Sequence, residues 1–286
     1  MIQDESNTYR TVIFSIAALI AFASNSIICR LALREEVIDA SSFSVIRLIS
    51  GAAALWLILV LSGYRKNPEY NGSWTSALML FLYAFAFSFA YIDLDAGIGA
   101  LILFGVVQLT MLLTGLAKGE RPRPIQYIGL FLAMGGLVYL IWPGIESPSL
   151  HSSGLMAVAG IGWGVYSLRG RGNKLPAAVT TDNFIRTVPF AIMAGLVFLP
   201  QLHITTAGFI WAVISGAVTS GIGYIIWYSA LRGLTRTRAA IIQLSVPVIA
   251  AFGGVILLSE SITLRLILAG VLTLGGITLS IYGKEK

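Results

Sequence analysis

Apolar runs of about twenty residues recur along nearly the whole chain of 286 residues, separated only by short polar, glycine- or proline-containing breaks. As a helix, such a run is long enough to cross a hydrocarbon layer about 30 Å thick. In lipid every backbone polar group must find its partner within the protein, and these runs lack the alternating pattern of barrel strands. The sequence therefore predicts an all-α integral membrane protein.

Cutting the sequence at its polar breaks predicts ten transmembrane helices. Composition agrees, because 57% of the residues are hydrophobic and only 11% are charged, against roughly 25% charged in soluble domains. The predicted spans are 11–33, 41–62, 74–92, 96–117, 124–142, 154–169, 180–199, 207–230, 239–258 and 265–283.

The basic residues predict the orientation of the spans. When the breaks are assigned to alternate sides, fourteen of the nineteen Lys and Arg residues fall on the side of the N-terminus. By the positive-inside rule that side is cytoplasmic, and an even number of crossings puts both termini there. The fourteen are Arg10, Arg65, Lys66, Lys118, Arg121, Arg123, Arg169, Arg171, Lys174, Arg232, Arg236, Arg238, Lys284 and Lys286.

The chain also contains an internal repeat. One register matches apolar, glycine and charged positions alike, which is hard to obtain by chance. Because each copy holds five spans, the second copy enters the membrane from the opposite side, and the sequence predicts two inverted five-helix domains, 1–145 and 146–286, around a central cavity. A shift of 140 pairs Ala90 with Ala230, Leu94 with Leu234, Ala100 with Ala240, Val106 with Val246, Glu120 with Glu260 and Gly135-Gly136 with Gly275-Gly276, and a shift of 139 pairs Ile46-Arg47 with Ile185-Arg186.

Inverted repeats favour a carrier, because two near-equivalent halves provide two near-equivalent states, each open to one side. An intramembrane enzyme is disfavoured: His151 and His203 are the only histidines, and no Gly-x-Ser-x-Gly or His-Glu-x-x-His motif is present. A channel stays as an alternative, since aromatic cavities and glycine-rich helices also suit pores.

The repeat unit resembles the drug/metabolite transporter superfamily, in the branch with two EamA-type repeats. The motifs are Gly162-Trp163-Gly164 at the start of the second repeat, Pro247 in the ninth span, and Lys118-Gly119-Glu120 beside Leu258-Ser259-Glu260. The resemblance covers essentially the whole chain and implies a ten-helix exporter of the bacterial inner membrane, with spans five and ten packed outside the other eight. Length and pattern are most similar to bacterial exporters of aromatic amino acids, and exporters of drugs or other metabolites share the same fold.

Polar side chains within the spans are the first candidates for solute binding, because such residues are costly in lipid and face the interior or a cavity. Ser24 and Asn25 stand where the family pattern has Trp-Gly, and they either bind solute or bond to another helix. Gln108 and Gln243 are further donors. Pro247 frees the carbonyl of residue 243, which makes the ninth span a candidate hinge.

Aromatic residues are the second group of candidates. Tyr83 and Phe87 are four residues apart and share one helix face, which suits the wall of a cavity for a flat apolar solute. The other aromatic candidates for the lining are Trp163, Tyr166 and Tyr224, whereas Tyr91, Trp227 and Tyr228 are expected at the membrane interfaces.

Two arginines related by the repeat, Arg47 and Arg186, lie inside spans near opposite ends of the bundle. Each could bind a solute carboxylate and act in gating, but we expect them mainly to extend toward the nearer interface. Glu120 and Glu260 close the fourth and ninth spans, and beside Arg121 or Arg265 they are expected to be interfacial anchors.

Acidic residues are absent from the middle of every predicted span, whereas a proton-driven antiporter usually needs a buried titratable group. The sequence therefore predicts facilitated efflux rather than strong proton coupling. No cofactor, metal or nucleic acid is expected. The expected partners are a small-molecule solute and the lipid bilayer, and the sequence leaves the oligomeric state open, a monomer included.

Overall fold

The structure is a computed structural model that describes residues 2–63, 71–119, 123–170, 175–234 and 236–282. The regular structure of these residues is helical, apart from one isolated antiparallel bridge between Ile38 and Ile204. In chain order the elements are α1 (Ile2–Arg34), α2 (Ala40–Leu61), α3 (Trp74–Ala90), α4 (Ala96–Ala117), α5 (Pro124–Ile141), α6 (Leu150–Gly170), α7 (Pro176–Val197), η2 (Leu199–Gln201), α8 (Thr206–Val213), η3 (Ile214–Ile222), α9 (Gly223–Leu231), α10 (Arg236–Gln243), α11 (Ser245–Leu258) and α12 (Leu264–Tyr282).

Each predicted span coincides with a helical segment, but the eighth and ninth are interrupted. The eighth consists of α8, α9 and, between them, the nine-residue segment η3, which has π-helical hydrogen bonds. The ninth breaks at Leu244, between α10 and α11 and three residues before Pro247. The break fits the loss of a backbone donor at the proline.

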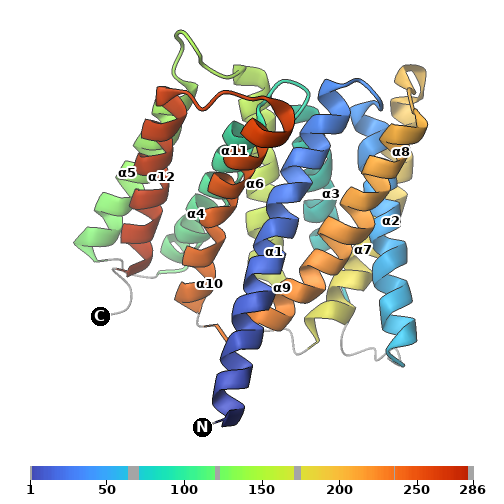
Figure 1. Cartoon of the computed structure of the whole chain (residues 1–286), viewed down its shortest axis with the longest axis horizontal. Helices are drawn as coiled ribbons and strands as arrows, with labels where there is room; N and C mark the ends of the chain where they lie inside the picture. The colour runs from blue at the N-terminus through green and yellow to red at the C-terminus, as the bar shows by residue number, and fades with distance from the viewer. Residues whose placement is uncertain (1, 64–70, 120–122, 171–174, 235, 283–286) are drawn as a thin grey trace.

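The helices stand side by side, and α1 begins and α12 ends at the same end of the bundle (Figure 1). The helices α1 and α6, which begin the two repeats, run in opposite directions. Seven helical stretches in the described residues are long and apolar enough to cross a membrane, and α3 is a shorter apolar helix.

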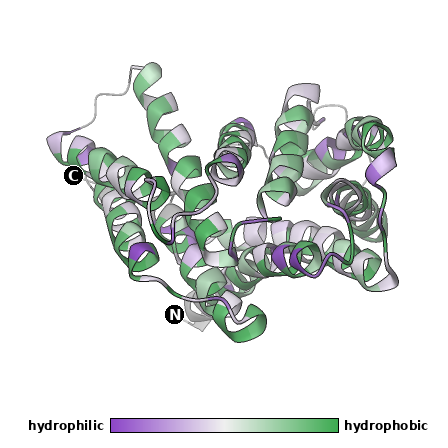
Figure 2. Cartoon of the chain, turned by 90° about the horizontal axis from the view of Figure 1, so that it is seen from above, coloured by the Kyte–Doolittle hydropathy of each residue, from purple (hydrophilic) through white to green (hydrophobic). Residues whose placement is uncertain are grey.

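The outer faces of the bundle are apolar. Large side chains such as Phe131, Met193 and Leu257 are about two-thirds exposed. Seen from above, the helices are hydrophobic over most of their length (Figure 2). Monomeric soluble proteins rarely expose such a continuous apolar surface, whereas lipid covers it without cost. The protein is therefore a multi-pass membrane protein.

The helices α5 and α12 pack on each other at one side of the bundle (Figure 1). Their contact depends on small residues: a Cβ atom on Gly276 would lie 2.6 Å from the carbonyl oxygen of Gly129, and one on Gly129 would overlap the backbone of Gly276. Close approach of backbones through glycine is the usual way in which helices associate in lipid.

The Gly160-x-x-x-Gly164 motif of α6 has the same role inside the bundle. A Cβ atom on Gly160 would lie 2.8 Å from Val106, and one on Gly164 would lie 2.9 Å from Thr110. The two glycines therefore bring α6 of the second repeat directly against α4 of the first, as expected for close packing.

Candidate functional site

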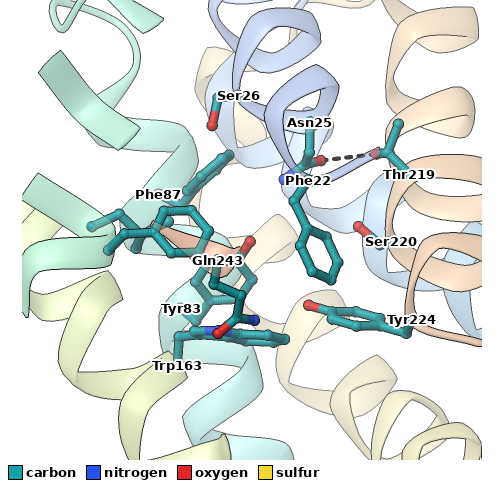
Figure 3. A pocket seen from close by; sticks show the side chains of 12 residues that line it. Phe22, Asn25, Ser26, Tyr83, Phe87, Trp163, Thr219, Ser220, Tyr224 and Gln243 are labelled. Atoms are coloured by element: carbon teal, nitrogen blue, oxygen red, sulfur yellow. Dashed lines mark hydrogen bonds between the residues drawn. The ribbon is translucent and has the colours of Figure 1, made fainter. Parts of the chain in front are cut away.

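A narrow cavity lies between the two repeats (Figure 3). The helices α1, α3 and α4 of the first repeat and α6, η3, α9 and α10 of the second line it. In this conformation the side chains leave room for little more than one water molecule. The lining residues are Phe22, Asn25, Ser26, Tyr83, Phe87, Leu103, Phe104, Trp163, Thr219, Ser220, Tyr224 and Gln243.

Aromatic rings form a continuous part of this lining. The ring of Trp163 stacks on that of Tyr224 at 5.1 Å between centroids and contacts Tyr83 at 5.0 Å. Tyr83 in turn contacts Phe87 at 5.4 Å, and Phe22 contacts Tyr224 at 5.8 Å. These rings come from both repeats, so a flat apolar solute placed here would touch both halves of the protein.

Hydroxyl groups and amides form the polar part of the lining. Asn25 Oδ1 accepts hydrogen bonds from Ser215 Oγ at 2.7 Å and from Thr219 Oγ1 at 3.2 Å, so Asn25 both bonds to another helix and lines the cavity (Figure 3). Ser215, Thr219 and Ser220 all belong to η3. Single π-helical turns are frequent at functional sites, because the wider turn redirects side chains.

Arg47 lies directly behind the cavity wall. The residue is only 2% exposed, about two turns into α2, and does not reach an interface, contrary to our expectation. Its Nη2 donates to the Tyr83 hydroxyl at 2.9 Å and its Nε to Ser220 Oγ at 3.3 Å. The guanidinium carbon lies 4.9 Å from the centroid of the Phe87 ring.

Within the described residues Arg47 belongs to no ion pair, and its Nη1 has no hydrogen-bond partner. Burying a cation without a counter-ion is costly, since its hydration is lost and only hydroxyls and ring faces replace it. Such a group is an exception in a folded protein and is a candidate functional group.

Arg186, the repeat-related residue, has different surroundings. Its Nε donates to Asp182 Oδ2 at 3.0 Å, and its guanidinium carbon lies 5.2 Å from the centroid of the Trp74 ring. Asp182 also accepts from the backbone N–H of Gly72 at 2.7 Å. Arg186 is therefore charge-compensated and joins α7 to the start of α3.

Three of the nine predicted binding residues, Ser24, Gln108 and Tyr166, do not line the cavity. Tyr166 lies behind the lining and stacks on Trp163 at 5.5 Å between centroids. Gln108 is buried in α4, and Ser24 is half-buried on another side of α1. Pro247 lines an apolar groove formed by α4, α11 and α12 instead of the central cavity.

The lining also includes residues that the sequence analysis missed, namely Phe22, Ser26, Leu103, Phe104, Thr219 and Ser220. A sequence signal existed for three of them. Phe22 is three residues before Asn25 and therefore lies on the same side of α1. Thr219 and Ser220 form a pair of adjacent polar residues in the middle of a largely apolar span.

Tyr91 and Trp227, which we expect at the membrane interfaces, are buried against other helices at 0% and 6% exposure. Both belong to clusters of aromatic rings within the bundle: Tyr91 packs edge-on against Phe87 and Trp227 against Phe22. Tyr228 is half-buried, and its hydroxyl accepts a hydrogen bond from Thr180. The aromatic core is therefore larger than the sequence analysis predicts.

A cluster of charged residues joins three elements at the end of the bundle where α1 stops. Arg30 Nε contacts Glu260 Oε1 at 3.3 Å, and Arg30 Nη2 contacts Asp95 Oδ1 at 3.4 Å. Arg30 Nη1 also donates to the carbonyl oxygens of Tyr91 and Ile92. The cluster thereby connects the end of α1 to the α3–α4 and α11–α12 connections.

Glu260 accepts a second hydrogen bond at Oε2, from the backbone N–H of Ala96 at 2.9 Å. Its partner is thus Arg30 and not the expected Arg265. Burial, and after it the nearby charge of Asp95, raises the pKa of Glu260 above the ordinary value of a glutamate, although Ala96 and Arg30 act in the opposite direction.

Several residues of the sequence analysis lie outside the described residues: Arg65, Lys66, Glu120, Arg121, Arg171, Lys174, Lys284 and Lys286. In the part of the chain that the structure describes, no group of three or more His, Cys, Asp or Glu side chains is placed to hold a metal ion.

A helical bundle with apolar outer faces and an aromatic and polar cavity between its halves has the architecture of a membrane transporter. The chain belongs to the EamA-like transporter family of the drug/metabolite transporter superfamily, whose model matches it twice, at residues 9–142 and 152–282. This family consists of transporters, which are not enzymes.

The chain is also similar to individual proteins. A Pseudomonas aeruginosa protein named only as uncharacterized is 48% identical over 270 residues, 94% of each chain. A Bacillus subtilis protein named as an uncharacterized transporter is 23% identical over 84% of this chain and 86% of its own. A Salmonella typhimurium protein named as a probable amino-acid metabolite efflux pump is 25% identical over 66% of this chain and 68% of its own. One crystal structure shares the fold over 94% of this chain and 96% of its own, with a TM-score of 0.66 at 17% identity.

Proposed function

We propose that the protein is a carrier of ten transmembrane helices that exports small metabolites, foremost aromatic and other neutral amino acids, across a bacterial inner membrane. Its domains are the two inverted repeats, 1–145 and 146–286, and both termini lie in the cytoplasm. The observation that carries the proposal is the cavity itself, whose aromatic wall is built jointly by both repeats. The name of the Salmonella typhimurium relative, a probable amino-acid metabolite efflux pump, points the same way.

Alternating access follows from this arrangement. A site shared by two halves opens to one side or the other when the halves rock, and the Arg30 cluster is suited to hold one end closed. The small volume of the cavity fits a conformation in which it is not open to a solute. Solute binding then requires the aromatic side chains to move apart.

We expect facilitated efflux. None of the lining residues is an Asp or Glu, so the cavity itself offers no carboxylate to carry a proton in exchange for solute. Export of a solute without net charge then follows its concentration gradient.

The test is counterflow in proteoliposomes that contain the purified protein, comparing phenylalanine, tryptophan, leucine, threonine and the cation tetraphenylphosphonium. Saturable exchange of the amino acids supports the proposal. Exchange of the cation alone would indicate a drug exporter, flux that does not saturate and shows no counterflow would indicate a channel, and both results contradict the proposal.

A further inference from the structure

Arg47 introduces a positive charge at the cavity wall that no described side chain balances. Its guanidinium has five N–H donors. Among the described residues only Nε and one N–H of Nη2 have hydrogen-bond partners, and Nη1 has none. The pocket side chains themselves include no acidic residue. The wall of the cavity therefore holds a buried positive charge that has no acidic partner among the described residues, in a medium of low dielectric constant.

The contacts of Arg47 place this charge at one part of the cavity. Tyr83, Phe87 and Ser220 all touch the guanidinium and also line the cavity. A solute oxygen bound beside Tyr83 and Ser220 would lie close to the guanidinium, because both side chains hydrogen-bond to it. An oxyanion there gains charge-assisted hydrogen bonds, whereas an ammonium group meets a like charge.

We propose that Arg47 binds the carboxylate of the solute and that the site prefers aromatic carboxylates without an amino group to the zwitterionic amino acid of the same skeleton. The aromatic wall binds the ring of the solute and Arg47 binds its anion, while the cavity offers no carboxylate for the ammonium. This inference rests on the proposed export of small metabolites, and within them it moves the preferred substrate from the aromatic amino acid to the carboxylate that lacks the amino group.

A solute with a net negative charge responds to the membrane potential as well as to its own concentration gradient. A cell interior that is negative expels anions, so the membrane potential itself drives export of a monocarboxylate. Export against a concentration gradient then needs no proton exchange, which suits a cavity lined without acids.

Binding tests the inference independently of transport. The probes are 3-phenylpropanoate, phenylalanine and 2-phenylethylamine, which share a ring and a two-carbon chain and differ in charge. Binding to the purified protein is measured by thermal stabilisation in detergent. We expect 3-phenylpropanoate to bind more tightly than phenylalanine and at least about tenfold more tightly than 2-phenylethylamine, as a charge-assisted hydrogen bond predicts. Equal or tighter binding of the amine, tighter binding of phenylalanine than of 3-phenylpropanoate, or no binding by any of the three would overturn the inference.

Transport then separates this inference from the proposed function. In proteoliposomes with valinomycin and tenfold more K⁺ outside than inside, the interior becomes positive, and a univalent anion should accumulate about tenfold. Accumulation of 3-phenylpropanoate, but not of phenylalanine, under this gradient supports potential-driven movement. Tight binding of 3-phenylpropanoate without any counterflow or accumulation would contradict the proposed carrier and leave the binding site standing.

Discussion

Arg47 and Arg186 occupy repeat-related positions, each after an isoleucine, yet the two halves of the protein surround them differently. Arg186 is paired with Asp182 one helical turn earlier and packs on Trp74. Arg47 has Phe43 at the corresponding position four residues earlier and contacts Tyr83, Phe87 and Ser220 instead.

The difference shows how one repeated position can have two roles. In the second half a neighbouring carboxylate neutralises the arginine, so its role is to connect helices. In the first half the cost of burying the charge is not offset by an acid, and a bound anion would lower that cost. Arg47 is therefore the arginine expected to act on the solute.

The largest expected effect comes from giving Arg47 the acid that Arg186 has. Ser220 Oγ lies 3.3 Å from Arg47 Nε, so the carboxylate in Ser220→Asp would pair with the guanidinium and repel a solute anion. We expect binding of 3-phenylpropanoate to weaken by at least about tenfold, the equivalent of one charge-assisted hydrogen bond. The neutral variant Ser220→Asn is the matched control. Equal binding by the two variants would show that the charge of Arg47 does not act on the solute.

The next effect concerns the hydroxyl that holds Arg47. Tyr83→Phe removes the acceptor of Arg47 Nη2 and leaves a second nitrogen of the cation unsatisfied. We expect the free energy of unfolding to fall by about 1–3 kcal/mol, measured by denaturant titration in mixed micelles. The control Trp74→Phe keeps a ring face beside Arg186 and leaves the ion pair with Asp182 intact. We expect it to change the free energy of unfolding by less than about 0.5 kcal/mol. A smaller loss of unfolding free energy in Tyr83→Phe than in Trp74→Phe would show that the surroundings of Arg47 do not depend on the Tyr83 hydroxyl more than those of Arg186 depend on Trp74.

A smaller effect is expected from removing the acid of Arg186. Asp182→Asn eliminates the ion pair, while the amide oxygen can still accept from Gly72. We expect a loss of about 1 kcal/mol in the free energy of unfolding, because the pair is partly exposed. Phenylalanine counterflow should stay within about twofold of wild type. A tenfold loss of transport would place Arg186 in the solute pathway as well.

The smallest effect is expected at Glu260, which is one of the two acidic partners of Arg30. Burial, followed by Asp95, raises the pKa of Glu260, so the folded protein retains this proton at a higher pH than the unfolded chain does. The contribution of Glu260 to stability therefore increases as the pH falls through the raised pKa toward the ordinary value of a glutamate. Glu260→Gln lacks this dependence.

Thermal unfolding of both proteins, as the pH is lowered from about 7 to about 4.3, the ordinary pKa of a glutamate, measures the effect. Relative to Glu260→Gln, the wild type should become more stable as the pH falls. A constant difference between the two proteins over this range would contradict the raised pKa.

Much of the fold could be predicted, because membrane crossing depends on local properties. The length of an apolar run limits where a helix can begin and end, and the fourth span, 96–117, coincides with α4. The position of Tyr83 and Phe87 on one side of α3 could also be predicted from the local sequence, since residues four apart share a helix face, and both residues line the cavity.

The rest depends on contacts that span the two repeats. Ser24 and Ser26 flank Asn25 equally in sequence, but only Ser26 lines the cavity, because the side of α1 that faces inward depends on its neighbours. The burial of Arg47 likewise depends on residues such as Tyr83 and Ser220, far away in the sequence. The π-helical segment η3 could not be predicted, because its small residues show no periodic pattern that distinguishes it from an α-helix.

The most direct measurement of the central claim is phenylalanine counterflow by Arg47→Gln and Arg186→Gln, side by side in proteoliposomes. Both substitutions remove one positive charge from repeat-related positions, so they are matched controls for each other, and gel filtration in detergent checks that both proteins fold. We expect Arg47→Gln to lose at least about 90% of exchange, whereas Arg186→Gln keeps most of it. Equal activities, or a greater loss in Arg186→Gln, would show that the buried charge of Arg47 has no special role in transport.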